Sequence, residues 1–212
     1  MHAKRRLRAE MRARRSALST AYRHSAALGL YRSFRRHPLF LRAASIAGYF
    51  PMGGELDPGP LLAHAHHLGK AVYLPVLNGQ SLRFARYHPG RSALRCNRYG
   101  IPEPRTPLHG GVDARALDLI LMPLVAFDAR GGRLGMGGGY YDRTLAYLQK
   151  RRHWRRPILI GVAHECQKVE RLDTNPWDIP LDLVATERRV YARSAGEAGP
   201  GTNGAECNAE DA

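Results

Sequence analysis

The sequence predicts an α/β fold: a single three-layer domain in which a mixed, mostly parallel sheet carries helices on both faces. Short apolar segments alternate with helix-like segments along the chain, the order typical of parallel sheets covered on both sides. The longest apolar segment, LDLILMPLVAF at residues 117–127, is hydrophobic at almost every position, as expected of a strand buried on both faces. With 212 residues, 44% of them hydrophobic, the chain suits one globular domain.

The N-terminal segment predicts helix from residue 4 to residue 34. Apolar residues recur there mostly at steps of four or seven, with arginines between them: Leu7, Met11, Leu18, Tyr22, Ala26, Leu30 and Phe34. This period places the apolar side chains on one face of a helix. Ser19 has a side chain suited to an N-cap, so a second helix is expected to begin after Leu18.

The remainder of the chain supplies further strands and helices. Strands are expected at residues 44–50, 70–76, 81–88, 117–127, 157–163 and 181–191, each apolar or alternating. Asp57 and Pro58 suit the cap and first turn of a helix that runs through Leu68, and another helix is expected from about Tyr140 to Lys150. Residues 1–191 then form the domain. Residues 192–212, rich in Gly, Ala, Glu and Asn without an apolar pattern, predict a disordered tail.

The composition favours a cytoplasmic protein that meets polyanions. The formal net charge is +15, and 29 arginines stand against 4 lysines. This excess predicts attraction to nucleic acid, nucleoside triphosphates or polyglutamated small molecules, without choosing among them. Cys96, Cys166 and Cys207 form no CxxC pair, which suggests reduced thiols. No apolar run approaches the length of about 18 residues that a membrane span needs, and the N-terminus lacks the apolar middle of a signal peptide.

The segment RLGMGGGYYDR, from Arg133 to Arg143, places four glycines within five positions between a buried strand and a helix. Backbone N–H groups at such a turn bind phosphate well, and glycine allows the phosphate a close approach. The segment is not a Walker loop, because no Lys-Ser or Lys-Thr follows the glycines, and Tyr140 breaks the dinucleotide fingerprint. Asp142 suits magnesium, and the flanking arginines suit phosphate oxygens. A mobile connector is the alternative interpretation.

Five segments, in order along the chain, resemble the 5-formyltetrahydrofolate cyclo-ligase family, also called methenyltetrahydrofolate synthetases. DLILMPLVAFDARGGRLGMGGGYYDR (residues 118–143) is similar to its signature, and KRRLR (4–8) to its N-terminal K-x-x-L-R element. YFPMGGELD (49–57), YGIPEP (99–104) and WDIPLDLVATE (177–187) are similar to its folate-side loop, central loop and C-terminal motif. One glycine loop would be a weak resemblance, but five ordered segments span nearly the whole chain.

The resemblance implies an ATP-dependent cyclisation. The formyl oxygen of 5-formyltetrahydrofolate attacks the γ-phosphate of ATP, N10 attacks the phosphorylated imine, and loss of phosphate gives 5,10-methenyltetrahydrofolate. Such chemistry requires positioning and charge neutralisation rather than a nucleophilic residue. The implied cofactor is Mg²⁺, with ATP as co-substrate. The resemblance leaves open whether the folate substrate carries a polyglutamate chain. The protein is expected to be a monomer that binds no specific nucleic acid and no membrane.

Residue by residue, the resemblance implies the following sites. ATP binding falls to Lys4, Arg5, Arg6, Leu7, Arg8, Arg133, Leu134, Gly135, Met136, Gly137, Gly138, Gly139, Tyr140 and Tyr141. Among these, Lys4 and Arg133 are the expected catalytic residues. Substrate binding falls to Arg8, Phe50, Glu55, Tyr99 and Tyr140, and the metal carboxylates are Asp142 and Asp178. Lys4 and Arg8 are four residues apart, which places both cations on one helix face.

Each assignment has a structural alternative. Lys4 and Arg8 would otherwise form part of a solvated basic face, and Tyr99 would be an exposed loop tyrosine. Asp142 and Asp178 would be capping residues, because Asp is common at helix starts and turns. Trp177 stands where many members of the family have a histidine, just before Asp178. This difference leaves undecided which groups surround the metal beyond its carboxylate ligands. The histidine-rich segment HAHH (64–67) has no carboxylate partner, and zinc needs three or four convergent ligands, so a metal site there is disfavoured.

Two other functions compete. Eleven of the first 36 residues are Lys or Arg, and Glu10 is the only acid among them, which is compatible with a basic RNA-binding protein. However, the sequence has no RRM, KH or zinc-knuckle signature, and the glycine loop would then have no purpose. The other alternative keeps the fold of the family but changes the substrate, because one fold hosts many activities.

Overall fold

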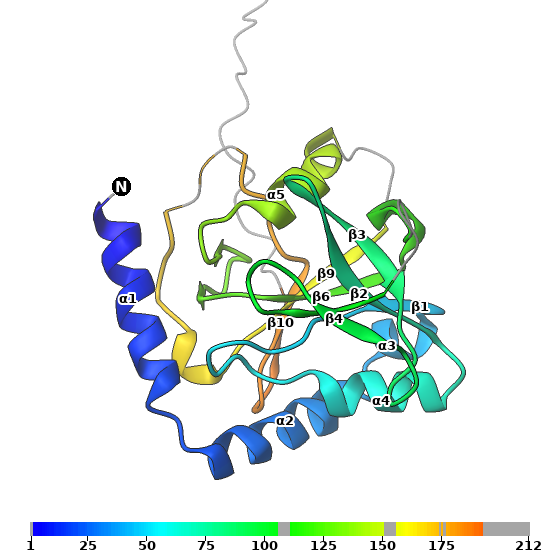
Figure 1. The fold of residues 1–212 in the computed structure, drawn as a ribbon. Helices are drawn as coiled ribbons and strands as arrows, with labels where there is room; N and C mark the ends of the chain where they lie inside the picture. Colours follow the sequence, from blue (N-terminus) through cyan, green and yellow to red (C-terminus); the bar gives the residue numbers. More distant parts are fainter. Residues whose placement is uncertain (1, 106–110, 151–155, 174, 176, 193–212) are drawn as a thin grey trace, which may run out of the picture.

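The computed structural model describes residues 2–105, 111–150, 156–173, 175 and 177–192. Within these residues, a seven-stranded sheet has the order β11-β10-β9-β6-β1-β2-β3 (Figure 1). Its strands are β1 (Ser45–Ala47), β2 (Ala71–Asn78), β3 (Ser81–Arg86), β6 (Leu119–Pro123), β9 (Ile158–Val162), β10 (Leu183–Ala185) and β11 (Val190–Ala192). The five inner strands are parallel, and the edge strands β3 and β11 are antiparallel to their neighbours. The predicted mixed, mostly parallel sheet is confirmed.

Helices cover both faces of this sheet. The helices α2 (Thr20–Phe34), α3 (Pro38–Arg42) and α4 (Gly59–His67) lie on one side, and α5 (Tyr140–Leu145) lies on the other (Figure 1). The turns η1 (Ala114–Ala116) and η2 (Ala146–Lys150) join α5 on its side. Strand β6 explains the layering: Leu119 and Leu121 enter the core with α2 and α4, whereas Ile120 and Met122 enter the core with α5. All four side chains are fully buried, as the apolar run predicted.

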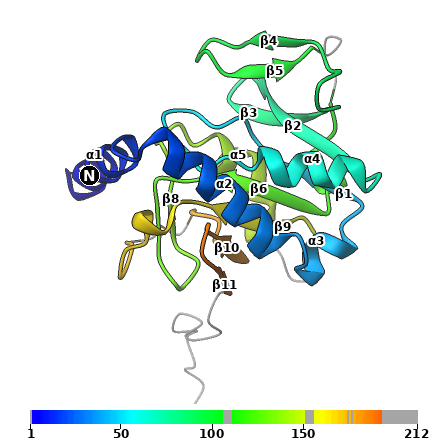
Figure 2. The same ribbon diagram turned by 90° about the horizontal axis from the view of Figure 1, so that it is seen from below.

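The N-terminal residues form two helices, α1 (His2–Ser16) and α2. The Ser19 hydroxyl accepts a hydrogen bond from the Tyr22 N–H at 3.1 Å, so the predicted N-cap is confirmed. Helix α1 stands at one side of the sheet (Figure 2). Its Met11 and Leu7 pack in a small separate core with Val125, Ala126 and Leu134. This contact places α1 beside the segment that leads into the glycine loop.

Several predicted boundaries were wrong. Residues 117–127 divide at Pro123 into β6 and a short strand β7 (Ala126–Phe127), which pairs with β8 (Arg133–Leu134). The α-helix expected to reach Lys150 ends at Leu145 and continues as the 3₁₀ turn η2. The helix expected from Asp57 begins at Gly59, although the Asp57 carboxylate still accepts the Gly59 N–H at 2.7 Å. The first expected strand, residues 44–50, keeps ladder pairing only as β1.

The segment expected as one strand at residues 181–191 is a hairpin of β10 and β11. The Thr186 hydroxyl accepts the N–H groups of Arg188 and Arg189 and so closes the turn. Ala192, where the tail was expected to begin, pairs with Leu183. Residues 193–212 lie outside the described residues, so the tail stays a prediction. The sequence also gave no sign of the small hairpin β4 (Leu94–Cys96) and β5 (Pro102–Pro104), which lies beyond β2 and β3 (Figure 2).

Candidate active site

The glycine loop, residues 135–139, connects β8 to α5 and is held by arginines at both ends. Arg8 of α1 donates from Nε to the Gly135 carbonyl at 2.8 Å. Arg143 donates to the Gly138 carbonyl at 2.7 Å. Gly137 and Gly139 have φ values of +102° and +66°, which side chains with a Cβ rarely adopt. The clustered glycines therefore serve a turn of defined shape.

Arg133 connects three segments of the site. Its guanidinium is buried, pairs with the Asp142 carboxylate of α5, and donates from Nε to the Ile179 carbonyl at 3.0 Å. The predicted catalytic arginine therefore touches one predicted metal carboxylate and lies beside the segment that carries the other, Asp178. The sequence predicted these residues as members of one site, and the fold brings them together.

The N-terminal helix adds two cations to the same place. The Lys4 Nζ atom lies 3.7 Å from the Asp178 Oδ2 atom, across two segments that are far apart in sequence. Arg8, one turn further along α1, reaches the glycine loop. Both side chains are half-buried. Lys4 and Arg8 therefore do more than belong to a solvated basic face. The neighbouring Arg5 and Arg6 side chains, by contrast, are exposed to solvent.

A cavity of about 270 Å³ lies between the segment that leads into β8 and the segment after β9, and Arg133 and Asp178 both line it. Arg130, Arg133, Arg171, Asn175 and Asp178 are among the residues that line it. Three arginines around one cavity favour an anion of phosphate character. The sequence had given no reason to select Arg130 or Arg171.

The loop that forms one wall of this cavity is built around a buried carboxylate. Asp128 accepts the backbone N–H groups of Arg130, Gly132 and Leu172, each at 2.9 Å. A Cβ on Gly132 would lie 2.7 Å from the Asp128 carboxylate, so only glycine fits there. Asp128 thereby fixes where Arg130 and the segment after β9 can stand.

Glu55 lies in the loop between β1 and α4. Its carboxylate accepts the Met52 N–H at 3.1 Å and lies 3.5 Å from the Arg15 guanidinium. Burial raises the pKa of Glu55, and the Met52 N–H and Arg15 partly oppose this effect. Phe50, the other predicted folate contact from this loop, packs edge-on against the Tyr87 ring at 5.6 Å.

Tyr141 lies near both Glu55 and Arg133. Among the described residues its buried hydroxyl has no hydrogen-bond partner. Burial, and then the charge of Glu55, raise the pKa of Tyr141, whereas the charge of Arg133 lowers it. The hydroxyl therefore lies within electrostatic range of both Glu55 and Arg133. A buried donor without a partner is costly, and a bound ligand would supply the missing acceptor.

Tyr99 and Tyr140 contact each other at the protein surface. Tyr99, in the turn between β4 and β5, is 53% exposed, and its hydroxyl lies 2.9 Å from that of Tyr140. The hydrogen bonds from Tyr99 and then from Arg98 lower the pKa of Tyr140. The two predicted substrate-binding tyrosines are thus neighbours, and Arg98, which the sequence did not single out, joins them.

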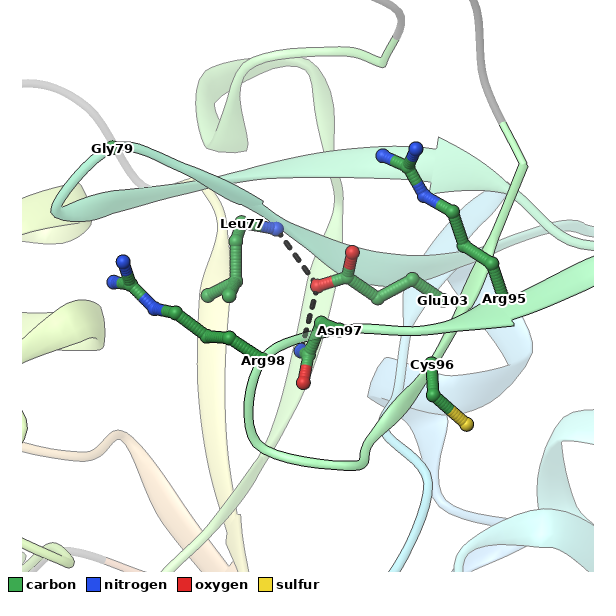
Figure 3. Close-up of a pocket in the computed structure, with 7 residues that line it drawn as sticks. All are labelled: Leu77, Gly79, Arg95, Cys96, Asn97, Arg98 and Glu103. Carbon is green, nitrogen blue, oxygen red and sulfur yellow. Dashed lines mark hydrogen bonds between the residues drawn. The ribbon is translucent and has the colours of Figure 1, made fainter.

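A second cavity, of about 340 Å³, adjoins this tyrosine pair. Arg95 and Arg98 extend to opposite sides of Glu103 in it (Figure 3). Glu103 is buried and accepts the Leu77 N–H at 2.9 Å and the Asn97 side-chain amide at 2.8 Å. These bonds attach the β4–β5 hairpin to the end of β2 and so position Tyr99.

The remaining predicted residues occupy less informative places. Leu7 and Leu134 pack in the core under α1, so their side chains face the protein interior. Met136 and Trp177 are exposed, at 54% and 62%. His64 of the histidine-rich segment packs against the Tyr31 and Phe40 rings.

The described residues contain no group of three or more His, Cys, Asp or Glu side chains that could hold a metal ion. Asp142 and Asp178 are instead each paired with a cation, Arg133 and Lys4. Two carboxylates are enough for magnesium when substrate phosphates and water complete its shell. The donor set therefore fits a magnesium ion that arrives with a triphosphate. No helix in the described part of the chain is long and apolar enough to cross a membrane.

A model of the 5-formyltetrahydrofolate cyclo-ligase family matches residues 1–187. The chain belongs to this family. It is 40% identical over 185 residues to the 5-formyltetrahydrofolate cyclo-ligase of Escherichia coli K12, covering 85% of this chain and 98% of that protein. The Haemophilus influenzae enzyme of the same name is 39% identical over 182 residues, covering 82% and 92%.

Solved structures agree with the family assignment. The 5,10-methenyltetrahydrofolate synthetase of Aquifex aeolicus superposes with a TM-score of 0.76 at 33% identity, covering 93% of this chain and 96% of that chain. The synthetase from Mycoplasma pneumoniae superposes with a TM-score of 0.65 over 87% and 98% of the two chains, and at 24% identity it supports the fold alone. The resemblance seen in the sequence is confirmed, and the chain is an enzyme of the cyclo-ligase family.

The unpaired hydroxyl of Tyr141 leads to a stability test. Removing a buried hydroxyl that lacks a partner removes a desolvation penalty, so Tyr141→Phe should leave the free energy of unfolding unchanged or raise it by up to about 1 kcal/mol. Tyr49→Phe is the matched control, because the buried Tyr49 hydroxyl donates to the Leu56 carbonyl at 2.6 Å. That variant should lose about 1–3 kcal/mol. Urea unfolding of both ligand-free proteins measures the difference, and equal losses would contradict the unpaired state of Tyr141.

Proposed function

We propose that this enzyme converts 5-formyltetrahydrofolate to 5,10-methenyltetrahydrofolate, with conversion of ATP to ADP and phosphate through a phosphorylated formyl intermediate. The observation that carries the proposal is an arginine-lined cavity that two distant segments share and that a third segment, α1, reaches through the contact of Lys4 with Asp178. Lys4 comes from α1, Arg133 from β8 and Asp178 from the segment after β9, and contacts join each of them to the next segment. Members of the family bear the name of this reaction.

The triphosphate is assigned to the glycine loop and the arginine-lined cavity. The glycine loop, which follows β8, would offer backbone N–H groups, and Arg130, Arg133 and Arg171 line the cavity and would offer charge. Lys4 and Arg8 approach from α1. These groups neutralise charge on the transferring phosphoryl group, which is the main task of a protein in phosphoryl transfer.

Folate is assigned to the side of Glu55, Phe50, Tyr99 and Tyr140. Glu55 suits the N–H groups of the pterin ring, which a buried carboxylate binds strongly. Tyr141 stands between this side and Arg133, where the formyl group and the γ-phosphate would have to meet. Its free hydroxyl suits an oxygen of either reactant.

The proposed reaction balances without a covalent enzyme intermediate. The formyl oxygen attacks the γ-phosphorus, and the bond from that phosphorus to the ADP oxygen breaks. The N10 amine then attacks the activated formyl carbon and loses its proton, and the C–O bond to phosphate breaks with departure of phosphate. An amide oxygen is a poor leaving group until it is phosphorylated, which explains the need for ATP. The residues supply orientation and charge, worth several kcal/mol each in favourable cases.

Asp142 and Asp178 are the residues that would hold Mg²⁺. When bound, the ion would neutralise phosphate charge and orient the triphosphate. Both carboxylates are partly exposed and paired with cations that could transfer to phosphate oxygens. A role as capping residues is the alternative, and Asp178 does accept the Asn175 N–H at 2.7 Å.

The activity is tested directly with purified protein, 5-formyltetrahydrofolate, ATP and magnesium. The near-ultraviolet absorbance of the methenyl product should rise only when ATP and a divalent metal are both present, and removal of the metal by EDTA should stop it. ADP should form in a one-to-one ratio with product. Product formation without ATP would contradict the phosphorylated intermediate, and no product under any of these conditions would refute the proposed reaction.

The metal role is tested by Asp142→Asn and Asp178→Asn. Each change removes one charged ligand, so turnover should fall about tenfold or more and half-maximal activity should need more magnesium. Asp173→Asn is the matched control, because Asp173 is exposed in the same segment as Asp178. It should behave as the parent protein does. Normal turnover of either site variant at low magnesium would exclude that carboxylate as a ligand.

The role of α1 is tested by replacing Lys4 and Arg8 together with alanine. Loss of charge-assisted hydrogen bonds to a ligand should cost about 1.5–3 kcal/mol per residue, or about tenfold or more in kcat/KM for each. Arg12→Ala/Arg14→Ala removes the same charge from exposed positions of the same helix. Surface charges of that kind contribute less than about 1 kcal/mol, so this control should lose little. Equal small losses in both pairs would reduce the role of α1 to general electrostatics.

A further inference from the structure

A buried arginine, Arg15, contacts the loop that carries Glu55. Arg15 lies in the last turn of α1 and is 3% exposed. Its Nε donates to the Gly53 carbonyl at 2.9 Å, and its Nη1 atom lies 3.5 Å from the Glu55 Oε1 atom. The Glu55 side chain is itself 10% exposed. One guanidinium therefore binds both the backbone and the acidic side chain of a single short loop.

The loop has little freedom around this contact. Gly53 and Gly54 have φ values of +53° and +78°, so the chain turns through conformations that suit glycine. A Cβ on Gly54 would lie 3.3 Å from the Arg15 carbonyl, which shows how closely α1 approaches. On the other side, the buried His164 ring lies with Nε2 at 3.2 Å from the Gly54 carbonyl. The loop is thus enclosed between α1 and the turn after β9.

From this geometry we propose that Arg15 is a positioning residue: it orients the Glu55 carboxylate for the folate substrate. The inference rests on the proposed function, because it concerns the folate side of that reaction. Arg15 does not touch the phosphate-side cavity. Its contacts are with the loop of residues 53–55, whereas Lys4 and Arg8 of the same helix serve the glycine loop and Asp178.

The charged surroundings of the pair are defined. Glu55 faces Arg15 from α1, Tyr141 from α5 and Tyr49 from the segment after β1, and of these only Arg15 carries a positive charge. Arg15 in turn faces Arg12 of its own helix, Cys166 of the turn η3 (Glu165–Gln167) and the His164 ring before that turn. The Arg23 guanidinium of α2 reaches the same loop at Gly54. Burial raises the pKa of Glu55, and Arg15 opposes the rise. Loss of Arg15 therefore moves the pKa of Glu55 upward, so that the carboxylate becomes protonated at a higher pH.

The test compares Arg15→Met, which removes the charge at similar length, with Arg15→Lys, which keeps the charge but loses the planar fork. Arg14→Met is the matched control, because Arg14 is the exposed neighbour on the same helix and loses the same charge. For each protein, kcat and KM are measured for 5-formyltetrahydrofolate and for ATP over a range of pH. Far-ultraviolet circular dichroism and thermal unfolding verify the fold.

Arg15→Met should raise KM for 5-formyltetrahydrofolate about tenfold, with KM for ATP changed less than about threefold. The acid limb of kcat/KM for the folate should move to higher pH. Arg15→Lys should restore part of the affinity and return the acid limb toward that of the parent, and Arg14→Met should match the parent in both. If Arg15→Met does not fold, the comparison of Arg15→Lys with the parent and with Arg14→Lys decides by the same split between the two KM values.

The decisive control is the combination with Glu55→Gln. Because Arg15 is proposed to act through Glu55, Arg15→Met should cost little more in the Glu55→Gln background. Equal losses in both backgrounds, or equal rises of the two KM values without a shift of the acid limb, would overturn the proposal and leave Arg15 a structural residue. Calorimetric binding of 5-formyltetrahydrofolate separates this outcome from failure of the proposed reaction. An inactive parent that binds the folate still gives the same comparison through affinity, and a parent that does not bind it overturns both proposals.

Discussion

The site depends on the buried guanidinium of Arg133. It pairs with Asp142 on α5 and donates to the Ile179 carbonyl in the segment after β9, so that one side chain sets the distance between two parts of the site. The Arg133 side chain is 6% exposed, whereas that of Asp142 is 34% exposed, so the buried partner is the arginine. Its two contacts link β8 to α5 and to the segment after β9. The glycine loop lies between β8 and α5, and its two ends are fixed through this contact.

Helix α1 closes the arrangement from outside the sheet. Its apolar contacts with Val125 and Leu134 hold it against the strands β7 and β8. Its cations then reach different targets along its length: Lys4 reaches Asp178, Arg8 the glycine loop, and Arg15 the loop of Glu55. Because a helix is rigid over four turns, these three contacts share one orientation. The arginine-rich helix α1 therefore holds three segments of the site in place and also supplies positive charge.

The fold was predictable where burial on both faces leaves a pattern, and not where side-chain contacts decide. Residues 119–122 pack in the cores on both faces of the sheet, and their continuous apolar run predicted a central strand. The β4–β5 hairpin was not predicted because Leu94, Arg95 and Cys96 are all exposed, so β4 shows no alternation of buried and exposed residues. The turn at Thr186 was not predicted because hydrogen bonds to that hydroxyl close it, and apolar residues occur on both sides of the turn, at 183–185 and 190–191. Periodicity reports burial, and these two features do not depend on it.

Within the site, the glycines, Lys4, Arg8 and Arg133 could be recognised because they stand in motifs, whereas arginines outside those motifs could not. Lys4 is one of 4 lysines and stands in a motif, but Arg15, Arg98, Arg130 and Arg171 are four among 29 arginines. Only the fold shows which of them are buried or line a cavity.

The pairing of carboxylates with cations also constrains the proposed binding of the triphosphate. Asp142 and Asp178 are already neutralised by Arg133 and Lys4, so a metal ion alone would have to displace a cation, and a triphosphate alone would meet two carboxylates. If the two bound together, Asp142 and Asp178 would hold the metal and Arg133 and Lys4 would face phosphate oxygens, so that every charge would keep a partner. Under the proposed function, the exchange of partners favours the magnesium complex of ATP over either component.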